Sequence, residues 1–320
     1  MSVFNILLAM VAFSSMAFAK DLYVPEKGIP SPVRDSDCDF SPACIPAEPV
    51  GNKLYFIPND PEGRTMYMYD AEKNTLEKTF VFEHHACDFK FINDHQFYVR
   101  EWKFGFYDLK QLGQPINKEI ATGTNDECRD EMLAYSSEAN KIFYTDGKTN
   151  ILYTEVGINN PVLLISGKDG FNDYLDTDGT NIYYRDIRSN LVSVNLAKST
   201  SKVVAENVSN LRATLVNPAA NALYFAYSEL KKCYLGKYDI KSGKLSRLTL
   251  DFCLYSLKLT PKNEIVATGY SGEFMILDQQ GKVLQKTKEA RAISSIDFLA
   301  DGKMYLVLAD GSLRVYRRQQ

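Results

Sequence analysis

The residues of this chain that could support chemistry include a short segment, 84 to 88, with two histidines and an aspartate. An imidazole can act as a general base when a carboxylate orients it. His84 or His85, together with Asp88 or Glu127, is therefore the candidate catalytic group. Adjacent residues of an extended segment point in opposite directions, so at most one of the two histidines can face a shared site.

The same region could instead hold a metal ion. An imidazole with carboxylates from Asp88 and residues 126–131 suits zinc or iron, whereas carboxylates alone suit calcium, which prefers oxygen ligands. Asp176-Thr177-Asp178-Gly179 matches the start of a calcium loop, but Asp-Gly is also typical of a plain hairpin turn, which we favour. The sequence leaves calcium or a transition metal open as a cofactor and defines no metal ligands.

Further polar residues precede short apolar runs along the chain. A concave surface with a few convergent polar groups is the usual form of a ligand site, although a solvated loop rim has the same composition. Both interpretations stay open. The residues expected to bind a ligand are Asp126, Arg129, Asp130, Asp173, Tyr174, Arg212, Asp251 and Tyr255.

The six cysteines contain no C-x-x-C pair, which gives no support to a zinc ribbon or a thioredoxin-type motif. An even number of cysteines in an exported chain predicts disulfides. Six cysteines allow fifteen connectivities. The predicted order of strands places Cys233 and Cys253 on one face, and Cys87 and Cys128 at the starts of inner strands, so the pairs Cys233–Cys253 and Cys87–Cys128 are expected, with Cys38–Cys44 tying the N-terminal arm. A nucleophilic Cys87 thiolate beside the two histidines is the alternative for that residue.

The elements that must position these residues recur along the chain. An apolar or aromatic pair follows a turn seven times, about every 40 to 45 residues, which is the period of a propeller blade with four strands. Another short apolar run precedes most of these turns and is expected to be the innermost strand. The pairs are Leu54-Tyr55, Phe97-Tyr98, Ile142-Phe143, Ile182-Tyr183, Leu223-Tyr224, Ile265-Val266 and Met304-Tyr305.

Several third strands are expected to end in an apolar or aromatic residue followed by aspartate, as in Tyr69-Asp70, Tyr107-Asp108, Tyr238-Asp239 and Leu277-Asp278. In this respect residues 51–320 resemble the WD40 and YWTD-like repeat propellers, in which a Trp-Asp or similar dipeptide closes the third strand. The resemblance implies an all-β, seven-bladed β-propeller. It implies no site residues, because it lies at the level of the fold.

The two ends of the chain are expected to meet. The last repeat has three strands, and Asp21-Leu22-Tyr23-Val24 could supply the fourth and close the ring, whereas a six-bladed ring would leave the last three strands unplaced. Residues 20–50 otherwise form a Pro-rich arm, and the first repeat lacks a clear inner strand unless residues 44–50 provide it. Residues 51–320 are the predicted propeller.

Residues 1–19 are predicted to be a signal peptide, with an apolar run from Ile6 to Phe13 and an Ala17-Phe18-Ala19 cleavage site. Cleavage would make the protein secreted, extracellular or periplasmic, and no later segment has 18 consecutive apolar residues, so no membrane span is expected after cleavage. Asn207 begins the one N-x-S/T sequon and is the candidate glycosylation site.

The function expected from these features is binding. A formal net charge of −3 gives no electrostatic case for nucleic acid. We expect a secreted propeller whose loop-rich channel mouth recognises a small molecule, a glycan or an extracellular protein. The alternative is a secreted enzyme of lactonase, esterase or oxidative type, with its site around His84 and His85. The sequence does not decide whether the protein is an enzyme.

Overall fold

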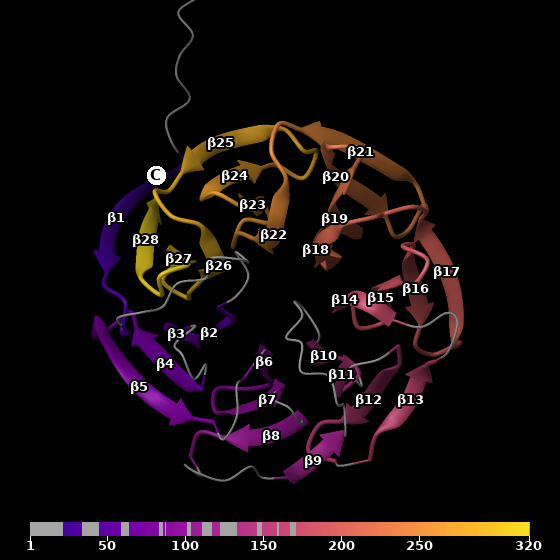
Figure 1. The fold of residues 1–320 in the computed structure, drawn as a ribbon, viewed down its shortest axis with the longest axis horizontal. Coiled ribbons are helices and arrows are strands. Elements are labelled where there is room, and N and C mark those ends of the chain that lie inside the picture. Colours follow the sequence, from indigo (N-terminus) through magenta and orange to yellow (C-terminus); the bar gives the residue numbers. More distant parts are fainter. Residues whose placement is uncertain are drawn as a thin grey trace, which may run out of the picture.

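The computed structural model describes residues 22–33, 45–58, 64–82, 86, 88–100, 104–110, 117–121, 133–145, 149–158, 160–166 and 171–319. These residues form seven four-stranded antiparallel sheets arranged as blades in a ring (Figure 1). The predicted seven-bladed, all-β propeller is therefore confirmed, and the six-bladed alternative is excluded. Within the described part of the chain, no helix is long and apolar enough to cross a membrane.

Six blades are each built from four consecutive strands, counted from the channel outwards. Blades 1 to 3 contain β2 (Ala47–Val50), β3 (Lys53–Phe56), β4 (Thr65–Asp70) and β5 (Thr75–Val81); β6 (Asp88–Phe91), β7 (Gln96–Arg100), β8 (Phe104–Asp108) and β9 (Asn117–Ala121); and β10 (Leu133–Ser136), β11 (Lys141–Thr145), β12 (Ile151–Glu155) and β13 (Val162–Ile165).

Blades 4 to 6 follow the same order. They contain β14 (Phe171–Thr177), β15 (Asn181–Asp186), β16 (Leu191–Asn195) and β17 (Thr200–Ala205); β18 (Leu211–Asn217), β19 (Ala222–Glu229), β20 (Lys232–Asp239) and β21 (Leu245–Leu250); and β22 (Leu254–Leu259), β23 (Ile265–Gly269), β24 (Glu273–Leu277) and β25 (Val283–Lys288). Every repeated aromatic pair lies in the second strand of its blade, as predicted.

Blade 7 joins the two ends of the chain. It contains β26 (Ile293–Phe298), β27 (Met304–Leu308) and β28 (Leu313–Arg318), and its outermost strand is β1 (Tyr23–Ile29). Tyr23 pairs with Arg318 and Ile29 with Leu313, so the predicted closure is confirmed and extends beyond Val24. The first inner strand, β2, lies inside the Pro-rich stretch, which means that the ring begins before residue 51.

The core lies between the blades. Second strands are buried on both faces, as in β23, because each blade is covered by a neighbour on either side. One cluster, for example, joins Ala213 and Tyr224 of blade 5 to Leu257 and Met275 of blade 6. The outer strand β21 is largely exposed, because no further strand covers it. This arrangement places the seven inner strands around a common channel.

The aspartate that ends several third strands has a local role. Asp70 accepts hydrogen bonds from the backbone N–H groups of Glu72 and Lys73, both at 3.0 Å, and so closes the turn into the outer strand. Asp278 accepts N–H groups in the same way in blade 6. Hydrogen bonds to the ionised carboxylate hold the pKa of Asp70 below its usual value. The repeated dipeptide is therefore explained by turn chemistry.

Candidate functional site

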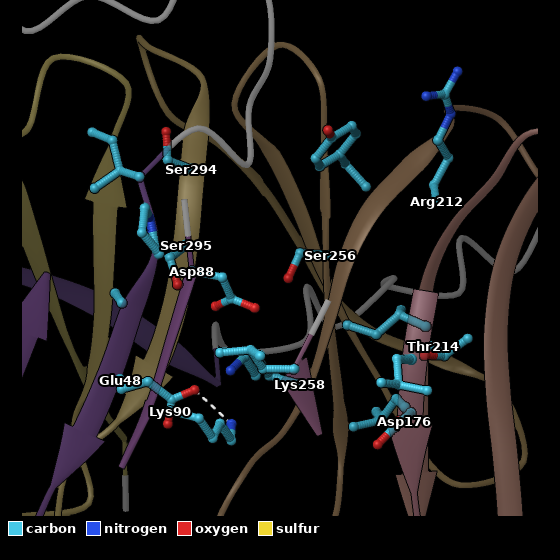
Figure 2. A pocket seen from close by; sticks show the side chains of 18 residues that line it. Glu48, Asp88, Lys90, Asp176, Arg212, Thr214, Ser256, Lys258, Ser294 and Ser295 are labelled. Atoms are coloured by element: carbon cyan, nitrogen blue, oxygen red, sulfur yellow. Dashed lines mark hydrogen bonds and ion pairs between the residues drawn. The ribbon is translucent and has the colours of Figure 1, made fainter. Parts of the chain in front are cut away.

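A cavity of about 300 Å³ lies in the central channel, and inner-strand segments of all seven blades line it. Its wall carries hydroxyl groups from Thr214, Ser256, Ser294 and Ser295, and charged side chains from several blades. Figure 2 shows these side chains converging from strands that are far apart in the sequence. The sequence predicted a concave site among the loops at the channel mouth, whereas most of the lining of this cavity lies on the inner strands.

Five charged residues occupy one repeated register position, opposite the second residue of the apolar or aromatic pair of their blade. We call them the charged layer. The pairs across the first two strands are Glu48 with Tyr55, Lys90 with Tyr98, Asp176 with Tyr183, Lys258 with Val266 and Asp297 with Tyr305. Blades 3 and 5 have Ala134 and Leu215 at this position. The charged layer therefore contains three acids and two lysines.

Four of these charged side chains form two ion pairs, each between neighbouring blades. Lys90 Nζ lies 2.5 Å from Glu48 Oε1, and Lys258 Nζ lies 3.1 Å from Asp297 Oδ1. Burial by itself would lower the pKa of Lys90, but the nearby Glu48 carboxylate outweighs it and the pKa lies above its usual value. Burial raises the pKa of Asp297, and the Lys258 ammonium offsets part of that rise.

Asp176 is the remaining acid of the charged layer. Its carboxylate accepts the backbone N–H of Thr177 at 2.7 Å and that of Val216, on the next blade, at 3.1 Å. No cationic side chain among the described residues lies within ion-pair distance of it. Burial raises its pKa, while the two N–H donors and the more distant charges of Lys90 and Lys258 lower it in part. Asp176 is thus a carboxylate in the cavity wall without a direct counter-ion.

The turn that follows Asp176 is structural. Asp178 accepts the backbone N–H groups of Thr180 and Asn181 at 2.9 and 2.6 Å, between β14 and β15. Gly179 has φ of +86°, which glycine adopts without strain. The preferred interpretation of Asp178-Gly179 as a hairpin turn therefore agrees with the structure.

A second group, which we call the mouth cluster, joins Arg212 of blade 5 to Tyr255 and Tyr270 of blade 6. The Arg212 guanidinium carbon lies 5.7 Å from the centroid of the Tyr270 ring. That ring packs edge-on against Tyr255, with the centroids 4.9 Å apart. Tyr255 is 6% exposed, whereas Tyr270 is 39% exposed. The buried ring therefore supports the exposed one, which in turn supports the guanidinium.

The structure brings three of the predicted site residues to the cavity: Asp88, Arg212 and Tyr255. Tyr174 is instead buried in an interblade cluster with Tyr183 and Leu191, and its φ is +56°. Asp251 forms an ion pair with Lys286 on the surface. The backbone of Asp173 belongs to β14. Asn207 is exposed just before β18, and its glycosylation stays a prediction.

The other predicted site residues lie outside the described part of the chain: His84, His85, Asp126, Glu127, Arg129 and Asp130. The predicted transition-metal site depended on several of them and stays a prediction. Within the described ranges, no group of three or more histidine, cysteine, aspartate or glutamate residues is placed to hold a metal ion. The third histidine, His95, contacts Asp108 at 3.0 Å, next to the turn that ends β8.

Cys233 and Cys253 form a disulfide, with their Cα atoms 4.9 Å apart. This is the pairing that the sequence predicted for these two residues. It ties the start of β20 to the segment entering β22, two residues before Tyr255. Cys38, Cys44, Cys87 and Cys128 lie outside the described residues, so the other two pairings stay predictions.

The sequence interpretation missed Tyr270 and the charged layer. A signal for the layer was present, because Phe89-Lys90-Phe91 and Leu257-Lys258-Leu259 each place a charge between two apolar residues of an inner strand. Such a charge is close to the neighbouring blade and needs a polar partner there. Tyr270 carried no comparable signal, because its role depends on a side chain of another blade.

Comparison with known proteins supports the fold and no narrower relationship. No family model and no curated protein matches the sequence. A chain in the crystal structure of the mitotic checkpoint complex has a similar fold, with a TM-score of 0.73, 14% identity, and coverage of 100% of this chain and 99% of that chain. The WD40 β-propeller domain of Doa1 is also similar, with a TM-score of 0.69, 12% identity, and coverage of 93% of this chain and 98% of that chain.

A streptogramin B lyase structure is also similar, with a TM-score of 0.71, 11% identity, and coverage of 93% of this chain and 98% of that chain. The predicted resemblance to WD40-like propellers is thus confirmed at the level of the fold. The class of protein that the fold defines is a seven-bladed β-propeller. Identities this low show the fold alone, and the site must be argued from its own residues.

Proposed function

We propose that this chain is a secreted binding module that takes a small polar ligand into the mouth of its central channel. The observation that carries this proposal is the cavity of about 300 Å³, which segments of all seven blades line and which hydroxyl and charged side chains from every blade except blade 3 face. Ligand sites usually combine a concave surface with a few convergent polar groups. The volume is at the small end for such sites, roughly 300–1,000 Å³, which favours a small molecule over a glycan chain or a protein within the cavity.

The placement of the site also supports this proposal. The mouth cluster and the four hydroxyl-bearing residues of the wall come from blades 5, 6 and 7, so that one ligand could contact several blades at once. The disulfide Cys233–Cys253 fixes the segment that enters β22 close to Tyr255. A site held by a rigid scaffold binds with a smaller loss of conformational entropy than one built on a free loop.

Binding in the cavity can be tested by filling it. A small-molecule screen by thermal shift and ligand-observed NMR would use cationic, neutral and anionic compounds on the wild type. The variant Ser256→Phe places a ring in the cavity and should abolish binding of the compounds found. The control Ser201→Phe, on the exposed outer strand β17, should bind them like the wild type. Compounds that bind Ser256→Phe unchanged would show that the ligand site lies elsewhere.

Secretion is a separate part of the proposal. The leader pattern of residues 1–19 supports it, and a disulfide is typical of oxidising compartments. Expression in a secretion-competent host, followed by mass spectrometry of the exported protein, should give a mature chain that begins at Lys20. A chain that stays inside the cell with its first 19 residues attached would contradict export.

A further inference from the structure

We infer that the ligand carries an oxyanion group, a carboxylate or a phosphate, that binds the guanidinium of Arg212 at the channel mouth. This inference rests on the proposed binding of a small molecule in the cavity and names the chemistry of that molecule. Arg212 lines the cavity at the end opposite Glu48, Lys90 and Asp176, as Figure 2 shows. It is the second residue of the inner strand β18 and is partly buried.

The charge of Arg212 has no carboxylate partner among the described residues. Arg318 and Arg291 differ from Arg212 in this respect. Arg318 forms a two-pronged ion pair with Glu264, with N–O distances of 2.5 and 2.7 Å, and Arg291 lies 3.1 Å from Asp310. Within the described part of the chain, the Arg212 guanidinium has no hydrogen bond or ion pair and lies over the ring of Tyr270. Its guanidinium therefore keeps its hydrogen-bond donors for another group.

The aromatic support prepares Arg212 for that role. Stacking on Tyr270 restricts the long side chain, and Tyr255 holds Tyr270 in place from the buried side. A guanidinium held over a ring still presents N–H groups at its edge, in a fork that matches two oxygens of a carboxylate or a phosphate. Because the side chain is already ordered, less rotamer entropy is lost when the anion binds.

The rest of the cavity fits an anion at the mouth better than one deeper down. The lysines of the charged layer, Lys90 and Lys258, already contact Glu48 and Asp297. Asp176 in the same layer would repel a second negative charge. The oxyanion is thus expected at Arg212, with Ser256 and the other wall hydroxyls near the uncharged part of the ligand.

The test uses simple probes on the full mature protein, with NMR titration or calorimetry at low salt. Sodium succinate and sodium phosphate represent the two sources of the oxyanion, and succinamide is the neutral control of the same shape as succinate. We expect at least one anion to bind the wild type and to bind at least about 10-fold more weakly to Arg212→Gln. Arg212→Lys should restore binding only in part, because a lysine offers no fork.

Two further variants separate a specific site from a general charge effect. Tyr270→Leu keeps the charge of Arg212 but removes its aromatic support, and should also weaken anion binding. Arg291→Gln removes a positive charge that is already paired and that lies in the loop before β26, and it should leave the binding unchanged. Thermal unfolding of each variant verifies that it is folded.

The outcomes distinguish this inference from the proposed function. If succinamide binds as tightly as succinate, or if the anions bind Arg212→Gln as tightly as the wild type, the oxyanion inference is wrong although the cavity still binds ligands. Failure of both anions to bind the wild type at tens of millimolar would overturn it too. If cationic or neutral compounds bind in the screen and Ser256→Phe blocks them, the proposed function stands without the oxyanion.

Discussion

Gln285 of β25 exchanges two hydrogen bonds with the backbone of Tyr23, the first residue of the closing strand β1. The Tyr23 N–H donates to Gln285 Oε1 and Gln285 Nε2 donates to the Tyr23 carbonyl, both at 2.7 Å. The two residues belong to neighbouring blades and lie 262 positions apart in the sequence. The contact fastens the start of β1 to blade 6 while the rest of that strand pairs with β28 in blade 7.

Removing the two hydrogen bonds between Gln285 and Tyr23 should destabilise the closed ring. Gln285→Leu leaves a buried N–H and a buried carbonyl without their partner, which we expect to cost about 1–3 kcal/mol of unfolding free energy. Urea denaturation measures the change. The control Gln280→Leu alters an exposed glutamine in the turn between β24 and β25 and should change stability by less than about 0.5 kcal/mol. Equal effects of the two substitutions would show that the hydrogen bonds of Gln285 do not stabilise the closed ring.

Removing only one partner of the ion pair between Lys258 and Asp297 should lower the unfolding free energy strongly. The Asp297 side chain is 3% exposed, so Lys258→Ala strands a buried carboxylate, and we expect a loss of about 3–5 kcal/mol. The double variant Lys258→Met with Asp297→Leu should recover much of it, because no unpaired charge remains. The control is Lys288→Ala. Lys288 is 61% exposed in its ion pair with Glu273, so this substitution should lower the unfolding free energy by less than about 1 kcal/mol.

Asp176 should make stability depend on pH. Because burial raises its pKa above the ordinary 3.8, the folded protein holds this proton more tightly than the unfolded chain does. Its contribution to stability is therefore fully present below the unfolded pKa and is lost as the pH rises through the folded pKa. Asp176→Asn should stabilise the protein at pH 7 relative to the wild type, and the gain should shrink near pH 4.

Urea denaturation at these two pH values checks the sign of that change. The control is Asp251→Asn, because the ion pair with Lys286 lowers the pKa of that surface carboxyl. Its small contribution to stability is present at neutral pH and is lost as the pH falls, which is the opposite direction. If Asp176→Asn and Asp251→Asn shift stability in the same direction at pH 7, the inference that folding raises the pKa of Asp176 is wrong.

The disulfide Cys233–Cys253 should stabilise the protein because it restricts the conformations of the unfolded chain. The two residues are 20 positions apart, and closing a loop of that size is worth about 3 kcal/mol in the chain-entropy view. The double variant Cys233→Ser with Cys253→Ser should therefore unfold at a lower urea concentration than the wild type. Iodoacetamide labelling of the unreduced, denatured wild type should leave both cysteines unlabelled, and labelling of either one would contradict the pairing.

The sequence by itself determined the architecture. The aromatic pairs repeat at the blade period because each second strand is buried between two neighbouring blades, and this burial selects apolar residues at fixed spacing. The three-stranded last repeat and the apolar run Leu22-Tyr23-Val24 predicted the closure for the same reason, since an unpaired sheet edge requires a strand. The pairing of Cys233 with Cys253 followed from the same topology.

The tertiary structure alone decided which polar side chains meet. Alternation along a strand tells which side a residue faces, but the twist and tilt of neighbouring blades set which side chain lies opposite. Only the assembled ring therefore shows that Lys90 contacts Glu48 and that no cationic side chain of the described residues lies within ion-pair distance of Asp176. It likewise shows that the Arg212 guanidinium lies over the Tyr270 ring, while Arg291, before β26, forms an ion pair with Asp310. Contacts between residues that are tens of positions apart depend on this packing, which no local pattern records.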